Sequence, residues 1–213
     1  MFCPDGAAET RDHVPPRSFF PEKLPSSTRL ITVPCCKTCH NASQTTDGVL
    51  RNLFISVRET ESTPYVKQGL VSKRDRSFDR NRSELMRLLQ LSQRVEVKSP
   101  AGIFLRDDLA FNFDVPIVHK FVERAARAVL WEEFRLPYFS GMFPWRLNLD
   151  LGELGYVGLA KFGHVRKVHD VFAYGVTIPK ETEPSWVVLN FYGSLEILAR
   201  VNFDPMNKNH EQV

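Results

Sequence analysis

The sequence lacks both a long apolar run and a recognisable export signal. No stretch approaches the roughly 18 consecutive apolar residues that a membrane-spanning helix needs. The first residues, Met-Phe-Cys-Pro-Asp-Gly, have neither the basic start nor the apolar stretch of a signal peptide. The chain also contains no Gly-rich phosphate loop and no Gly-x-Ser-x-Gly elbow, so it carries no signature of those two enzyme classes. These absences predict a protein outside the membrane and favour a cytoplasmic location.

Cysteine is scarce and clustered. The chain has four cysteines in 213 residues, and three of them are Cys35, Cys36 and Cys39. Thiols stay reduced in the cytoplasm. Because Cys35 and Cys36 are adjacent, they are also poorly placed to form a disulfide bond that stabilises the fold. The Cys-x-x-Cys spacing of Cys36 and Cys39 favours a structural zinc site with Cys3 as the third ligand. For the fourth ligand three options stay open: Cys35 takes this place, the site is incomplete, or a further cysteine lies upstream. In the other interpretation, these are buried thiols in a loop without metal.

Charge is the next indicator. Apolar residues make up 43% and charged residues 25% of the chain, which is typical of a globular protein with one sizeable domain or a small module plus a domain. The net charge of +3 is too small to indicate nucleic-acid binding by itself. Residues 51–94, however, carry ten Lys and Arg against five Asp and Glu. Lys73, Arg74 and Arg76 belong to this segment. One interpretation is that it binds the phosphate backbone of a nucleic acid. The alternative is a solvated surface on which Asp and Glu residues alternate with the basic ones.

The first sixty residues predict two strands and a helix. Prolines interrupt residues 1–41, and short strands are expected at 11–14 and 30–33, joined by a loop over 18–28. Apolar residues recur at helical spacing over 43–59, with Thr46 or Asp47 as the expected cap.

The remaining residues predict an α+β arrangement. Residues 60–82 show no sustained hydrophobic period and are interpreted as a linker. Residues 163–170 are interpreted as a basic loop. Its two histidines, His164 and His169, either bind a metal together or are ordinary loop residues. The clearest helix is expected at 114–134, with Lys120, Glu123, Arg124 and Arg127 on its polar face. The other expected elements are a helix at 83–91 capped by Ser83, a hairpin of 94–98 with 102–105, and strands at 145–151, 171–178, 186–192 and 195–203.

The dipeptide Asp12-His13 is a candidate for chemistry. Neighbouring side chains on an extended segment point to opposite faces. The carboxylate and the imidazole can therefore approach one reacting group from different sides. Asp12 would then hold a metal while His13 takes a proton from water, which suits the ordinary pKa of histidine. The alternative is a capping aspartate beside a surface histidine.

Together, Thr10-Arg11-Asp12-His13-Val14-Pro15-Pro16 and Cys36-Lys37-Thr38-Cys39-His40-Asn41 resemble the HNH endonuclease family, whose core is the ββα-metal fold. The resemblance covers about residues 3–57 and is closest to uncharacterised bacterial proteins. It implies that His13 is the general base and that Asp12 and His40 hold one Mg²⁺ or Mn²⁺ ion at the scissile phosphate. It also implies a structural Zn²⁺ on the cysteines.

Two departures from the family pattern concern the site. The family's middle Asn falls near Arg29, and no Asn lies between His13 and His40. Arg29 is well placed in the sequence to grip a phosphate, as are Arg11 and Arg17 beside the Asp-His pair, although a solvated surface role is the alternative. The second departure is the missing cysteine before Cys3.

The sequence therefore predicts an α+β protein in three segments. A small zinc-knuckle ββα-metal module (1–60) precedes a basic linker and helix (61–94) and an α+β domain with a long helix on an antiparallel sheet (95–213). The predicted function is metal-dependent hydrolysis of DNA phosphodiester bonds. The alternative is a catalytically inactive, zinc-stabilised module that binds nucleic acid or a protein. The oligomeric state is left open, with a homodimer as one option.

Overall fold

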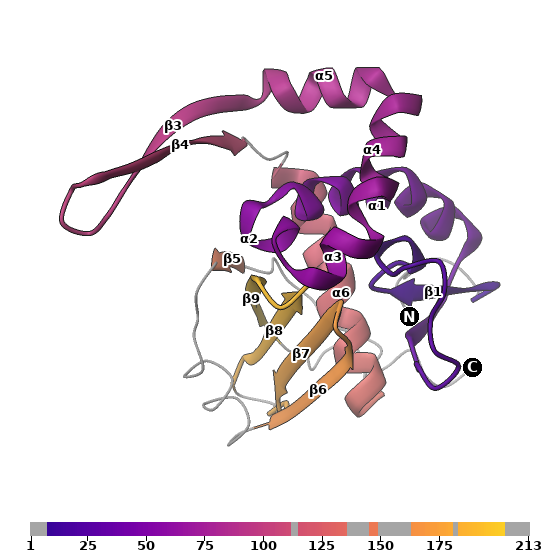
Figure 1. Cartoon of the computed structure of the whole chain (residues 1–213). Helices are drawn as coiled ribbons and strands as arrows, with labels where there is room; N and C mark the ends of the chain where they lie inside the picture. Colours follow the sequence, from indigo (N-terminus) through magenta and orange to yellow (C-terminus); the bar gives the residue numbers. More distant parts are fainter. Residues whose placement is uncertain (1–7, 112–114, 136–144, 149–162, 181–182, 203–213) are drawn as a thin grey trace.

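The computed structural model describes residues 8–111, 115–135, 145–148, 163–180 and 183–202 (Figure 1). Near the N-terminus, β1 (Thr10–Val14) pairs antiparallel with β2 (Ile31–Cys35). Asp12 lies opposite Val33 in this ribbon. A short 3-10 helix, η1 (Arg17–Phe19), lies in the connection. Both predicted strands are thus confirmed, and β2 runs through Pro34, because an outer strand tolerates a residue without an N–H.

Helix α1 (Lys37–Ser56) begins six residues earlier than predicted, within the cysteine motif itself. Its N-cap is Cys36, whose Sγ accepts a hydrogen bond from the backbone N–H of Cys39 at 3.4 Å. This contact satisfies one of the N–H groups that every helix start leaves without a partner. The expectation that Thr46 or Asp47 caps the helix is therefore wrong, since both residues lie inside α1.

The predicted linker over residues 60–82 is wrong, because this segment is mostly helical. It forms the second half of α2 (Arg58–Glu61), then α3 (Pro64–Gly69) and α4 (Val71–Arg80). Pro64 occupies the first turn of α3, where its missing N–H costs nothing. Val66 and Leu70 are fully buried and anchor the segment to the core. Because only these two apolar residues of the described segment are fully buried, its sequence lacks the repeated apolar spacing by which a helix is predicted.

The next helix and the hairpin are confirmed with small shifts. Helix α5 (Arg82–Gln90) is capped by Asn81, whose side chain accepts from the N–H of Glu84, and not by Ser83. Strands β3 (Ser92–Lys98) and β4 (Phe104–Phe111) pair antiparallel and are longer than predicted. In Figure 1 this hairpin projects away from the rest of the molecule, like an arm.

The C-terminal half places a long helix on an antiparallel sheet, as predicted. Helix α6 (Val115–Phe134) precedes a sheet whose strands, within the described residues, lie in the order β5-β9-β8-β7-β6. The strands are β5 (Trp145–Asn148), β6 (Gly163–His169), β7 (Phe172–Thr177), β8 (Ser185–Phe191) and β9 (Leu195–Val201). Tyr192 and Gly193, both with positive φ, form the turn between β8 and β9.

The expectation of a loop at residues 163–170 is wrong, because this segment is strand β6, paired with β7. β6 is an outer strand of the sheet and has exposed side chains on both faces, such as His164 and Val165. A strand of this kind lacks the alternation of apolar and polar residues on which sequence prediction relies.

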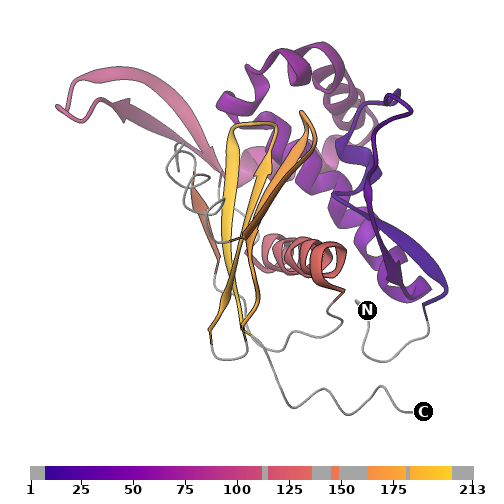
Figure 2. The ribbon, with the colours of Figure 1, turned by 90° about the horizontal axis from the view of Figure 1, so that it is seen from below.

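Helix α6 lies between the two halves of the molecule. In Figure 2 the sheet lies on one side of α6, and β1, β2 and α1 lie on the other. The ring of Phe19 from η1 stacks on Phe121 of α6 at a centroid distance of 5.4 Å. Phe54 of α1 contacts Phe191 of β8 at 5.2 Å. The predicted division at residue 60 stays a prediction, but the apolar side chains of both parts share one core.

Candidate functional site

Asp12 and His40 meet where β1 approaches the first turn of α1. The Asp12 side chain is 7% exposed, and its Oδ1 lies 3.5 Å from Nδ1 of His40. Because side chains alternate along a strand, His13 projects to the opposite side of β1, where it is partly exposed. The structure therefore brings together two of the three predicted catalytic residues, with the third on the adjacent position of the same strand.

The imidazole of His40 is held on its other side by Gln44, one turn further along α1. The two Nε2 atoms lie 3.1 Å apart. His40 Nδ1 is buried and has no hydrogen-bond partner within the described ranges. Its contact with Asp12 is within ion-pair distance but too long for a good hydrogen bond. The oxygen and nitrogen of the Gln44 amide can be exchanged by turning the amide. In the orientation where the oxygen accepts a hydrogen bond from Nε2–H, the proton of the neutral ring is on Nε2. Nδ1 then carries a lone pair that faces the carboxylate of Asp12.

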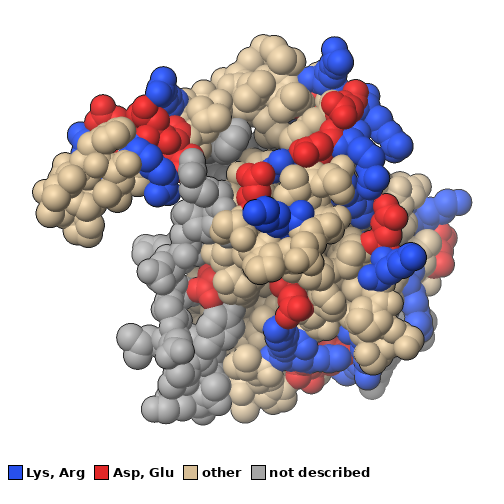
Figure 3. Space-filling view, viewed as in Figure 1, with Lys and Arg blue, Asp and Glu red and all other residues tan. Residues whose placement is uncertain are grey.

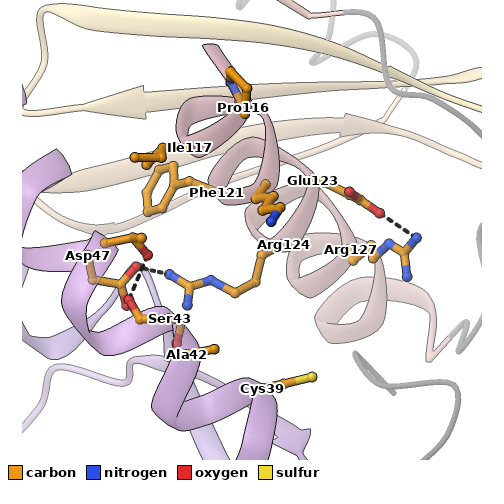
Figure 4. A pocket seen from close by; sticks show the side chains of 12 residues that line it. Cys39, Ala42, Ser43, Asp47, Pro116, Ile117, Phe121, Glu123, Arg124 and Arg127 are labelled. Atoms are coloured by element: carbon orange, nitrogen blue, oxygen red, sulfur yellow. Dashed lines mark hydrogen bonds and ion pairs between the residues drawn. The ribbon is translucent and has the colours of Figure 1, made fainter. Parts of the chain in front are cut away.

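Arg124 of α6 connects Asp12 to a second carboxylate. One guanidinium nitrogen lies 3.5 Å from Oδ2 of Asp12, and the other donates to Asp47 of α1 (Figure 4). All three side chains are at most 13% exposed. Burial raises the pKa of Asp47, and the charge and hydrogen bond of Arg124 oppose this rise. In formal side-chain charges, two carboxylates and one guanidinium give the cluster of Asp12, Asp47 and Arg124 a charge of −1.

The cysteine motif forms the start of α1, directly before His40. Cys35 and Cys36 are buried and Cys39 is partly exposed, while Cys3 lies outside the described residues. Within the part of the chain that the structure describes, no group of three or more His, Cys, Asp and Glu side chains is arranged to hold a metal ion. The zinc site and the magnesium or manganese site thus stay predictions.

Two of the six predicted phosphate-binding cations are engaged within the protein. Lys73 Nζ donates to the backbone carbonyls of Ser18 and Phe20, at 3.1 and 3.4 Å, and burial lowers its pKa. Arg74 is 13% exposed and pairs with Glu61 at 3.2 Å. Both side chains attach α4 to its neighbours, which leaves them poorly available to a ligand.

The other four predicted cations are accessible. Arg11 is exposed on β1, and Arg17 is exposed although it donates to two backbone carbonyls of the following loop. Arg29 is 73% exposed and lies 3.5 Å from Glu132 of α6. Arg76 is 59% exposed. In Figure 3, Lys and Arg side chains gather over α4 and the turn into α5, with acidic side chains among them.

A pocket of about 390 Å³ lies beside this cluster, between α1 and α6. Its walls come from α1 residues between Cys39 and Asp47 and from α6 residues between Pro116 and Arg127 (Figure 4). Arg124 lines the pocket and also reaches Asp12, so the pocket and the Asp12–His40 pair share this side chain.

The sequence interpretation missed three residues of the site. The sequence suggests Asp47 as a helix cap and places Arg124 on the polar face of its helix, without a role in the site, and it gives Gln44 no role. Their spacing held a weak signal, since Gln44 and Asp47 follow His40 by four and seven residues and share its helix face. Nothing in the sequence indicates that Arg124, 112 residues after Asp12, contacts it.

In comparisons with known proteins, no family model, no curated protein and no solved structure matched this chain. Among the described helices, none is long and apolar enough to cross a membrane. The cytoplasmic location, the homodimer and the resemblance to HNH endonucleases stay predictions.

Proposed function

We propose that this chain is a metal-dependent nuclease of the HNH type that hydrolyses DNA phosphodiester bonds. The observation that carries the proposal is the pair of Asp12 Oδ1 and His40 Nδ1, 3.5 Å apart, with Nδ1 buried and lacking a hydrogen bond in the described structure. Two atoms that each lie about 2.1 Å from one cation are about 3.0 to 3.4 Å apart, depending on the coordination angle. The pair is therefore close to the separation of two ligands of one ion.

The two donor atoms of this pair are of kinds that bind a divalent cation. Asp12 and His40 would hold Mg²⁺ or Mn²⁺ through one carboxylate oxygen and one imidazole nitrogen. The net charge of −1 on the cluster of Asp12, Asp47 and Arg124 favours the addition of a cation. When bound, the ion supplies charge neutralisation at the scissile phosphate and at the leaving oxygen.

His13 is the proposed general base. Its side chain is partly exposed and adjoins Asp12 on β1, so water and DNA have access to it. A neutral imidazole accepts the proton of the attacking water, which contributes a factor of roughly 10²–10⁴ to the rate. The exposed guanidinium of Arg29 is the proposed contact for a DNA phosphate in place of the family's Asn.

The cysteines are proposed to hold a structural Zn²⁺ that stabilises the start of α1. The hydrogen bond from the Cys39 N–H to Cys36 Sγ supports this role, because a donor aimed at the sulfur at a helix N-terminus favours the thiolate that binds zinc. The ion would connect this helix start to Cys3 and fix the position of the neighbouring His40.

A second candidate function is an inactive, zinc-stabilised module that binds nucleic acid or a protein. The contacts of Arg124 favour it, because this guanidinium already neutralises part of the charge of Asp12 and Asp47 without a metal. In this case the buried carboxylates are structural, and the protein would retain its partner but not cleave it.

The test combines plasmid nicking with a separate measurement of Mn²⁺ binding by calorimetry. We expect the protein to nick plasmid DNA with Mg²⁺ or Mn²⁺ and EDTA to abolish nicking. His13→Ala is expected to lose nicking but keep Mn²⁺ binding, since it is a base and not a ligand. Asp12→Asn and His40→Ala are expected to lose both.

His119→Ala serves as the matched control, because this α6 histidine does not line the pocket. Nicking that survives in His13→Ala would contradict the assignment of the base. A folded, zinc-loaded protein that neither binds Mn²⁺ nor cleaves DNA would favour the second candidate function.

A further inference from the structure

The pocket between α1 and α6 has one apolar wall and one row of cations. Pro116, Ile117 and Phe121 supply apolar surface from α6. Lys120, Arg124 and Arg127 also line the pocket, and their spacing of four and three residues places them in one row along the helix. The sequence predicts that these residues lie on the polar face of the helix, and in the structure Arg124 of this row pairs with Asp47 of α1 while Lys120 stays exposed.

The charges in the pocket do not cancel. Asp47 pairs with Arg124, and Glu123 pairs with Arg127 at 2.6 Å (Figure 4). Lys120 is exposed and makes no ion pair with the part of the chain that the structure describes. The lining therefore has a net charge of +1, carried by a lysine at an accessible position. A pocket of this kind suits a ligand with one anionic group and an apolar or aromatic part.

We propose that the pocket binds one unpaired nucleotide of the DNA strand, with its phosphate on Lys120 and its sugar and base against the wall of Ile117 and Phe121. This inference rests on the proposed function and names its substrate class. The volume of about 390 Å³ is within the range of about 300–1,000 Å³ typical of pockets for single small ligands. A base pair within a duplex cannot enter such a pocket, whereas a nucleotide of a single strand can.

The position of the pocket connects it to the candidate site. Arg124 lines the pocket and lies 3.5 Å from Asp12, so a nucleotide held there places the neighbouring phosphate of its strand near the Asp12–His40 pair. The structure thus assigns the substrate as single-stranded or locally unpaired DNA.

The test is fluorescence anisotropy with a labelled oligothymidylate of about twelve nucleotides, a length within the usual site size for one single-strand binding module. EDTA is present throughout, so the result does not depend on cleavage. We expect the single strand to bind more tightly than a duplex of equal length. Lys120→Ala is expected to weaken binding and to reduce the slope of log K against log salt by about 0.7, the value for one phosphate contact.

A second variant, Ala42→Phe, fills the pocket from α1, where Ala42 is exposed and the change leaves the core intact. It is expected to weaken single-strand binding at least tenfold. Lys67→Ala, which removes an exposed lysine from α3, is the control and is expected to bind as the original protein does.

Unchanged binding in both Lys120→Ala and Ala42→Phe, or equal affinity for single strand and duplex, would overturn the inference. These results would leave the nuclease proposal intact if the protein nicks plasmid DNA. Conversely, the protein could bind the single strand through the pocket and cleave no DNA. That result would support the binding inference and contradict the nuclease proposal.

Discussion

At the scale of single residues, the candidate site depends on how His40 is held. A histidine that binds a metal through one nitrogen usually donates its other N–H to an acceptor, which fixes the ring and the tautomer. Gln44 is in position for this role, with its side-chain amide 3.1 Å from His40 Nε2. Under the proposed function, Gln44 positions His40, and its amide oxygen, not the nitrogen, faces the ring when the proposed ion is bound.

Gln44→Leu is expected to weaken Mn²⁺ binding by about 10- to 100-fold, because the ring loses the acceptor that orients it. Gln44→Glu keeps an acceptor at the same place and is expected to restore most of the affinity. Calorimetry with Mn²⁺ measures both, and circular dichroism checks that Gln44, which is exposed, is not needed for folding. Equal affinity in the leucine and glutamate variants would contradict a positioning role.

At the scale of elements, α6 is attached to the sheet by a carboxylate near its C-terminal end. Glu133 accepts hydrogen bonds from the Tyr174 hydroxyl of β7 and from His164 Nδ1 of β6, the latter at 2.7 Å. Burial by itself would raise the pKa of Glu133, but these two hydrogen bonds and the nearby charges outweigh it and lower the pKa below its usual 4.5. The ionised form is therefore favoured in the folded protein.

This shift predicts a pH dependence. A carboxyl group whose pKa is lower in the folded state stabilises the protein above its ordinary pKa, and the contribution disappears as the pH falls through the folded value. Glu133→Gln is thus expected to lower the Tm at pH 7, and the difference from the original protein should shrink as the pH falls below about 4.5. Thermal melts at several pH values measure this. A Tm difference that is constant with pH would show that the charge of Glu133 does not matter.

At the scale of the whole molecule, one aromatic cluster joins the N-terminal strands to the C-terminal sheet. Phe19 is fully buried and contacts Phe54, Phe121 and Phe191, with centroid distances of 5.4 to 6.0 Å. The hydroxyl of Tyr192 donates to the backbone carbonyl of Phe19 at 3.1 Å. The N-terminal strands and α1 therefore depend on the C-terminal half for part of their core.

Phe19→Ala is expected to lower the free energy of unfolding by about 3–5 kcal/mol, the usual cost of removing a buried aromatic ring. Because the ring contacts both halves, we expect one cooperative transition in urea, followed equally by tryptophan fluorescence and far-UV circular dichroism. Phe104→Ala on the exposed hairpin arm is the control and should change stability by less than about 0.5 kcal/mol. Two separate transitions in the Phe19 variant would indicate two independent domains.

The sequence predicted those parts of the fold that have strong local patterns. The helix expected at 114–134 is confirmed as α6, and the apolar residues spaced along one side of it are buried: Val118, Phe121, Val122, Ala125 and Val129. The strands expected at 186–192 and 195–203 are confirmed as β8 and β9. The three short helices after α1 and strand β6 were not predicted. Among the apolar residues described in the helical segment, only Val66 and Leu70 are fully buried, and β6 is held by pairing with β7, so neither has a periodic pattern in the sequence.

The sequence by itself determined that Asp12 lies in a short strand and that His40 follows the cysteines, since strand propensity and residue spacing are local properties. Only the tertiary structure decided which charged side chains surround this pair. Arg124 is 112 residues from Asp12 and 77 from Asp47, so its place depends on how α6 packs between α1 and the sheet. Packing of that kind is a property of the assembled core, because a helix shows its polar face in the sequence but not the element that this face will meet.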